Sequence, residues 1–172
     1  MDVGRKRICG LALLTAFACG AEELPPEEPF ERLRPKIVAV VEAHARTVGC
    51  SVRVAPRHVV SWRRPDGRRL YIALYHADIG CSGGNAMSRP VLVVVHPGAY
   101  GTWMIDASHS MPQQTPETLP KEITALVPDG DELRFAGLML GPATDSACCP
   151  TQPVEGRVRL KLDAEPAWSV VP

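Results

Sequence analysis

The sequence lacks an excess of charge of either sign. Its 172 residues carry 19 Lys and Arg against 19 Asp and Glu. Residues 1–18 hold three of the basic and one of the acidic residues, so the rest of the chain has 16 basic and 18 acidic side chains. This small negative balance argues against a nucleic-acid partner, because proteins that bind nucleic acid present clustered positive charge to the phosphates.

The sequence also lacks a complete set of catalytic residues. Residues 80–84 match the G-x-S-x-G pattern of a serine nucleophile, and Asp106 and His109 follow in the order of a catalytic triad. That pattern requires a strand, a sharp turn and a helix, whereas residues 85–90 form a short loop that leads into another strand. We therefore assign no catalytic residue and expect the glycines to serve a tight turn.

The histidines lack the spacing of a metal site, because none has a second histidine at i+2 or i+4. His76 and Asp78 lie on one face of a predicted strand, which we expect to be solvated. No metal or other cofactor is expected. Surface or sheet-edge positions are predicted for the five histidines, which are His44, His58, His76, His96 and His109.

The chain contains no apolar run of membrane-spanning length. Residues 8–18 are apolar and follow the basic residues 5–7, which is the anatomy of a signal peptide and too short for a membrane span. We predict a signal peptide over residues 1–18, ended either by plain cleavage or by lipid attachment to Cys19, as in bacterial lipoproteins. Residues 19–29 are acidic and rich in proline, and would then be a stiff tether to the membrane.

Residues 30–172 are expected to form a single α+β domain, with one N-terminal helix packed on a mostly antiparallel β-meander built from hairpins. Helical spacing of apolar residues predicts the helix over residues 29–47, with its regular part beginning near Pro35. The proline-rich loop 108–121 is expected to be mobile. Turn residues and a period of two predict these hairpins: 51–62 with 69–79, 91–96 with 102–107, 123–127 with 133–140, and 157–162 with 168–171.

The first hairpin leads to a prediction about two cysteines. Pairing Trp62 with Arg69 across the turn sets Cys50 opposite Cys81, which predicts a disulfide worth about 3 kcal/mol in an oxidising compartment. The same register gathers the apolar residues of both strands on one face: Val52, Val54, Val60, Trp62, Tyr71, Ala73, Tyr75, Ala77 and Ile79.

Two adjacent cysteines, Cys148 and Cys149, remain. They can tie a loop to the sheet, form a vicinal disulfide, or stay as thiols for metal binding or exchange. Adjacent thiolates suit a metal poorly, since structural zinc sites separate their ligands by two to four residues. Neighbouring loop residues complete this candidate site: Gly83, Gly84, Asp145, Pro150 and Thr151.

The second half of the chain resembles a group of small exported bacterial proteins. The resemblance is carried by the motif D-S-A-C-C-P-T at residues 145–151, by the glycine-rich turn at 81–84 and by a charged alternating strand that ends near Trp168. The likeness covers about residues 70–172, and LppP/LprE-type lipoproteins are among the similar proteins. It implies an envelope protein of undefined biochemical role and supplies no activity.

Together these observations lead us to expect an exported protein of the bacterial cell envelope, lipid-anchored through Cys19 or periplasmic. It would contact the membrane through its lipid and bind an unknown protein or small-molecule ligand without catalysing a reaction. The alternative is a thiol-redox or metal-handling protein that uses Cys148 and Cys149.

Overall fold

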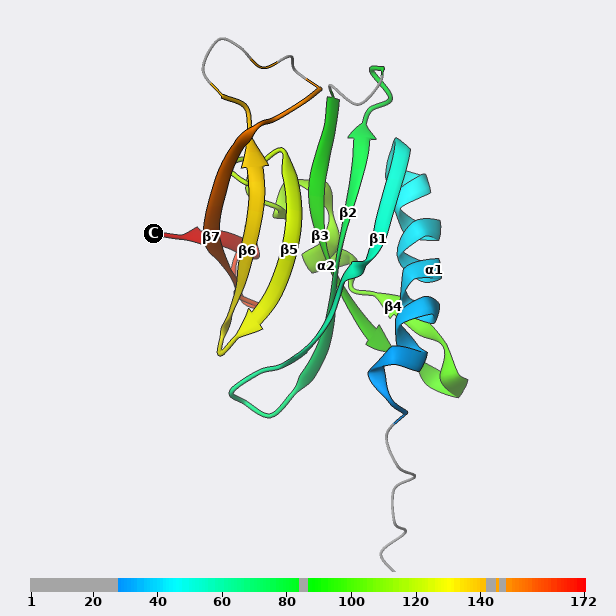
Figure 1. Ribbon diagram of the computed structural model, residues 1–172. Helices are drawn as coiled ribbons and strands as arrows, with labels where there is room; N and C mark the ends of the chain where they lie inside the picture. The colour runs from blue at the N-terminus through cyan, green and yellow to red at the C-terminus, as the bar shows by residue number, and fades with distance from the viewer. Residues whose placement is uncertain (1–27, 84–86, 142–144, 146–147) are drawn as a thin grey trace, which may run out of the picture.

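The computed structural model describes residues 28–83, 87–141, 145 and 148–172. The predicted signal peptide, Cys19, Gly84 and most of the predicted tether lie outside these residues. The described chain forms one main helix and two four-stranded antiparallel sheets, which confirms the predicted α+β fold (Figure 1). No helix within it has the length and apolar character needed to cross a membrane.

Each sheet is a meander in which neighbouring strands follow chain order. The first sheet contains β1 (Gly49–Arg63), β2 (Arg69–Ile79), β3 (Ser88–Pro97) and β4 (Trp103–Ile105). The second contains β5 (Glu122–Asp129), β6 (Glu132–Met139), β7 (Gln152–Leu160) and β8 (Trp168–Val171). The four predicted hairpins are therefore confirmed, and they divide into two sheets.

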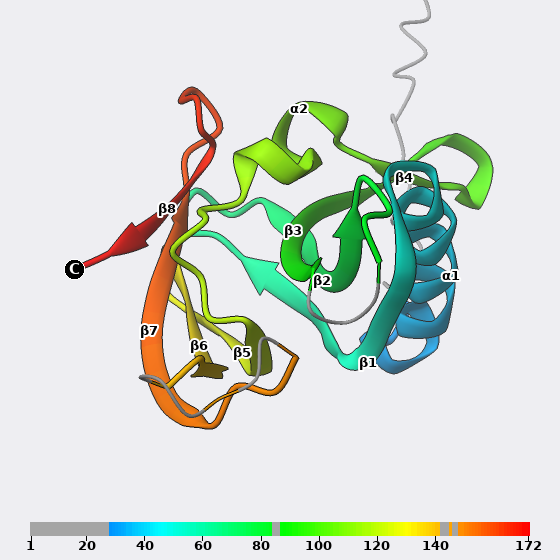
Figure 2. The same cartoon turned by 90° about the horizontal axis from the view of Figure 1, so that it is seen from above.

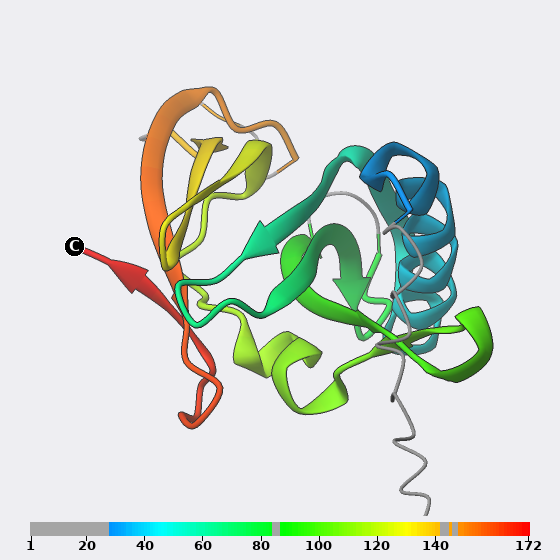
Figure 3. The same cartoon turned by 90° about the horizontal axis from the view of Figure 1, so that it is seen from below.

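The helix α1 (Phe30–Val48) and the two sheets form three layers, with the first sheet in the middle (Figures 2 and 3). One apolar core lies between α1 and the first sheet, where Ile37 and Val41 pack near Tyr75 and Val93. A second core lies between the sheets and is built from residues of both: Trp62, Ile72, Leu74, Leu92, Val94, Ile123, Leu126, Leu133, Phe135, Val158, Leu160 and Trp168. Strands β2 and β3 are thus buried on both faces.

The helix begins five residues before Pro35, so the prediction that its regular part starts near that proline is wrong. Proline removes one amide hydrogen bond, but tertiary contacts hold the first turns. The ring of Phe30 stacks on Tyr71 with 6.0 Å between centroids. The Lys36 ammonium lies 3.0 Å from the Glu28 carboxylate.

The predicted register of the first hairpin is also wrong, by one residue beside the turn. Trp62 pairs with Leu70 and not with Arg69. Further along β1 the ladder is interrupted, and residues 55–58 lie opposite Leu74 alone. This is a β-bulge, which changes the face that each later side chain occupies.

Pro56 lies in this bulge and explains it, because proline has no amide hydrogen to donate to the ladder. Beyond the bulge, Val60 and Trp62 face the second sheet. Before it, Val52 and Val54 pack on the core beside α1. The single apolar face predicted for this hairpin is therefore wrong, and its members divide between the two cores.

The bulge lets the far end of the first hairpin bend across to the second sheet (Figure 1). There the Trp62 indole donates a hydrogen bond to the carbonyl of Gly130 at 2.9 Å. The Arg64 guanidinium donates to the carbonyl of Leu160 at 3.3 Å. These two contacts fix the hairpin end on the second sheet.

Residues 108–121, for which mobility is predicted, cover the edge of β3. They include the end of the short helix α2 (Ala107–Ser110) and a turn of 3-10 helix. The amide of Val94 donates to the hydroxyl of Ser110, and the amide of Leu92 donates to the hydroxyl of Thr115, both at 2.9 Å. Strand β4 pairs with β3 only over residues 95–97, so these hydroxyls satisfy edge amides that β4 does not reach.

Candidate functional site

The space between the two sheets changes from apolar to polar along β2. Ile72 and Leu74 project from β2 into the core between the sheets. His76 and Asp78 continue the same face, because side chains alternate along a strand. They are only 3% and 1% exposed. The prediction that this face is solvated is therefore wrong, and the reason is the second sheet, which no local pattern indicated.

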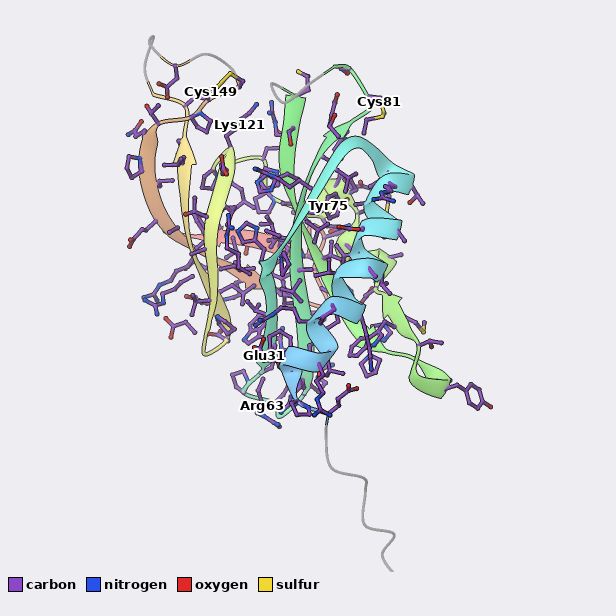
Figure 4. All side chains as sticks on the ribbon, turned by 45° about the vertical axis from the view of Figure 1, so that its right-hand side comes forward. Glu31, Arg63, Tyr75, Cys81, Lys121 and Cys149 are labelled. Carbon is purple, nitrogen blue, oxygen red and sulfur yellow. A yellow bond between two sulfur atoms is a disulfide. The ribbon has the colours of Figure 1, made fainter. Side chains whose placement is uncertain are left out.

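A pocket of about 200 Å³ lies at this polar end of the molecule. Figure 4 shows Lys121 and Cys149 at this end of the molecule. The pocket is lined from both sheets and from the loop between β6 and β7, by Ser51, Arg53, His76, Ser88, Lys121, Glu122, Cys148 and Pro150. It therefore joins the polar part of the inter-sheet space to one of the adjacent cysteines.

Two buried histidines lie next to each other, and one of them, His76, lines the pocket. The ring centroids of His58 and His76 are 6.3 Å apart, and each residue is 3% exposed. The prediction of surface or sheet-edge positions is therefore wrong for this pair. Within the described ranges, Nδ1 of His58 and Nε2 of His76 are buried without a hydrogen-bond partner. Such atoms are uncommon in folded proteins and mark places where a further group can bind.

Positive charge gathers around these histidines. Burial, and to a lesser extent the charges of Arg53 and His58, lower the pKa of His76 to about 4. Burial also lowers the pKa of His58. The pKa of Lys121 is lowered by burial and then by the nearby Arg89. Both imidazoles are consequently neutral at pH 7. The positive charge near them comes from arginine side chains, Arg53 among them.

Cys50 and Cys81 are joined by a disulfide, which confirms the predicted pair. The strand register at this disulfide differs from the prediction, because Cys50 lies opposite Asp78 and not opposite Cys81. A tight turn brings Cys81 back to the sheet with φ of 58°. The buried Asp78 carboxylate accepts hydrogen bonds from the amides of Ser82 and Gly83 at 3.2 and 2.7 Å. Gly80 and Gly83 lie in this turn with φ of 88° and 119°, as expected of them, while Gly84 is outside the described residues.

The sequence order Ser82, Asp106, His109 does not produce a triad. Nδ1 of His109 lies 2.6 Å from the Asp106 carboxylate, and its Nε2 lies 3.1 Å from the carbonyl of Leu162. Both ring nitrogens are thus engaged, and neither is left to accept a proton from a serine. Burial raises the pKa of Asp106, but hydrogen bonds from Ser108 and His109 outweigh this effect and the net shift is downward.

Cys148 and Cys149 are joined to each other, and both residues are exposed. Asp145 organises the loop that carries them. Its carboxylate accepts hydrogen bonds from the amides of Gly141 and Thr151 at 2.7 and 2.9 Å, and from the Thr151 hydroxyl at 2.9 Å. These bonds, with the Gly141 amide first, lower the pKa of Asp145. The charged carboxylate therefore links Gly141 to Thr151, which flank the segment that carries the disulfide.

The pocket brings together some of the residues predicted for the site and adds others. Cys148 and Pro150 line it, Thr151 supports Asp145, and Gly83 belongs to the turn at Cys81. Sequence reasoning missed the charged and imidazole groups, which are Arg53, His58, His76, Lys121 and Glu122. One feature of the sequence could have indicated these groups. His76 and Asp78 are polar residues at i and i+2 in the otherwise apolar strand β2.

Within the described part of the chain, no group of three or more His, Cys, Asp and Glu side chains is placed to hold a metal ion. Comparisons with protein-family models, curated proteins and solved structures found no match for the chain. The function must therefore be inferred from the chemistry of the described residues.

Proposed function

We propose that this protein is an exported, lipid-anchored module of the bacterial cell envelope that binds a small ligand between its two sheets and does not catalyse a reaction. The pocket beside the buried, unpartnered nitrogen of His76 carries the binding part of the proposal. The signal-peptide pattern and the resemblance to exported lipoproteins support export. The Cys50–Cys81 disulfide is in keeping with an oxidising compartment.

The size of the pocket indicates a small molecule. Its volume of about 200 Å³ is below the range of about 300–1,000 Å³ that is typical of sites for drug-sized ligands. Since each water molecule occupies about 30 Å³ in the liquid, the pocket corresponds to roughly seven waters. A nucleotide or a large cofactor does not fit this volume.

Native mass spectrometry of the exported protein, released intact from its envelope, tests the binding function. Ser88 lines the pocket, so Ser88→Trp is expected to fill it, whereas Ser169→Trp places the same bulk on exposed β8. We expect a small bound mass in the wild type and in Ser169→Trp, and its loss in Ser88→Trp. A bound mass that is equal in all three proteins contradicts the pocket as the site.

Lipid anchoring has a separate test. Labelled fatty acid is expected to enter the wild-type chain, and Cys19→Ala is expected to abolish the label and release the protein from the membrane fraction. A chain that stays membrane-bound and labelled after this substitution contradicts attachment at Cys19.

A second candidate function is thiol–disulfide exchange, favoured by the exposed Cys148–Cys149 bond at the pocket. A substrate dithiol would attack one sulfur as a thiolate and form a mixed disulfide, and its second thiol would then release the protein. The substrate loses two electrons and two protons and becomes a disulfide, while Cys148 and Cys149 become thiols.

The exchange function is tested with a reduced dithiol peptide. The oxidised protein is expected to yield one peptide disulfide and two new protein thiols per molecule, and Cys148→Ser is expected to lose this reaction with its fold intact. A wild-type protein that remains oxidised while the peptide remains reduced excludes this function.

A further inference from the structure

We infer that the ligand of the pocket is a small molecule with an oxyanion group, a carboxylate or a phosphate, held by Arg53, Lys121 and His76. This inference rests on the proposed binding function and specifies the chemistry of the ligand. Three observations carry it: the charge of the lining, the buried imidazole and the convergence of hydrogen-bond donors from separate strands.

The described lining has more positive than negative charge. Arg53 and Lys121 are cations, and Glu122 is the one carboxylate among the lining residues named above. The Arg53 guanidinium has five N–H donors, and its contact with Glu122 is a single one at 3.5 Å. Arg89 adds a further positive charge near Lys121. The pocket therefore favours an anion.

The imidazole of His76 belongs to the pocket wall. Its Nε2 is buried and has no partner among the described residues. Arg53 is the cross-strand neighbour of His76, so the guanidinium and the imidazole sit side by side on β1 and β2. An oxygen of a carboxylate or phosphate can accept from both groups, and charge-assisted hydrogen bonds of this kind are stronger than neutral ones.

Serine hydroxyls complete the set of donors. Ser51 on β1 and Ser88 on β3 line the same pocket as Lys121, so donors converge from three strands and from the residue before β5. A neutral ligand would make no charge-assisted hydrogen bonds with Arg53 and Lys121, and such bonds are the stronger kind. A metal cation would be repelled by Arg53 and Lys121.

Isothermal titration calorimetry of the exported protein at low salt tests this inference with three probes: succinate, inorganic phosphate and neutral succinamide. We expect one of the anions to bind and succinamide not to bind. The dissociation constant is expected to rise about tenfold or more in Lys121→Gln and in Arg53→Gln, because each removes a charged donor. Binding is also expected to weaken with added salt.

Arg134→Gln is the matched control, since this exposed arginine lies on β6 and pairs with Asp129 away from the pocket. Its affinity for the anion is expected to equal that of the wild type. The succinate and phosphate arms distinguish a carboxylate ligand from a phosphate ligand. Anion binding that is unchanged in both pocket variants overturns the inference.

Failure of the inference can be separated from failure of the proposed function. If neither anion binds, small molecules extracted from the envelope are titrated in their place. An extracted ligand that loses about tenfold in affinity in Lys121→Gln supports the inference, and one that binds the variant equally overturns it while the binding function stands. If neither the anions nor the extract bind, both the inference and the binding function are wrong.

Discussion

One change of residue type along β2 separates the apolar core from the pocket. Leu74 fills the space between the sheets, and two positions later the same face carries His76. Burial keeps this imidazole neutral, which avoids the larger cost of burying a charge. The change from Leu74 to His76 therefore determines both where the core ends and which polar groups line the pocket.

The depressed pKa of His76 predicts how stability depends on pH. In the unfolded chain this histidine titrates near 6.5, and in the folded protein near 4. The unfolded state therefore takes up a proton first as the pH falls, so the stabilisation is complete above pH 6.5 and is lost between 6.5 and 4. The loss amounts to about 3 kcal/mol when complete.

Urea unfolding at several pH values between 7 and 4.5 measures this dependence. His76→Gln is expected to remove most of it, although Arg53 and His58 still face the site. His96→Gln, at a half-buried histidine, is the control and is expected to keep the wild-type slope. An equally steep loss of stability in His76→Gln would show that other groups cause the acid sensitivity.

At the scale of elements, the strands could be predicted but the register could not. Turn residues at 64–68 and at 128–131 locate the hairpins, because they favour tight turns whatever the rest of the fold does. The effect of Pro56 is not local. Its lack of an amide hydrogen interrupts the ladder only when a partner strand lies beside it. The bulge then sends Val54 and Trp62 to opposite cores, and a strict period of two cannot show this.

The covered edge of β3 supplies a prediction at this scale. Thr115→Val keeps the shape of the side chain but leaves the buried amide of Leu92 without its acceptor. We expect a loss of about 1–3 kcal/mol in the free energy of unfolding. Thr124→Val, at an exposed threonine of β5, is expected to change it by less than about 0.5 kcal/mol. Equal effects of the two substitutions would contradict the role of Thr115 at the edge.

At the scale of the whole molecule, the chain enters α1 at the end opposite the disulfides. Figure 4 shows Cys81 and Cys149 at the end of the molecule far from the first turn of the helix, where Glu31 lies. The pocket residue Lys121 therefore lies at the end of the molecule opposite the start of α1.

The two disulfides are predicted to differ in their effect on stability. Cys50–Cys81 joins residues 31 apart, and replacing both cysteines with serine is expected to lower the free energy of unfolding by about 3–4 kcal/mol. Cys148–Cys149 joins neighbours and closes no chain loop, so its double serine variant is expected to lose less than about 1 kcal/mol. Chemical denaturation compares the two variants, and equal losses would contradict this division of roles.

The division into two sheets is what the sequence could not reveal. Both meanders have the same local signals, and the proline-rich segment 108–121 between them looks like an ordinary loop. Its buried Ser110 and Thr115 are recognisable only beside the edge of β3. The Cys50–Cys81 pair was predictable because the hairpin and the following turn bring the two cysteines together locally, whereas the pocket needs both sheets.

Amide chemical shifts show directly whether a ligand binds in the pocket between the sheets. The exported protein is titrated with small molecules extracted from its own envelope, and the signals of Arg53, His76 and Glu122 are compared with those of α1. We predict shifts that gather at the pocket in the wild type and vanish in Ser88→Trp, whose other signals remain those of a folded protein. Shifts confined to another surface, or shifts that survive in Ser88→Trp, would contradict the claim.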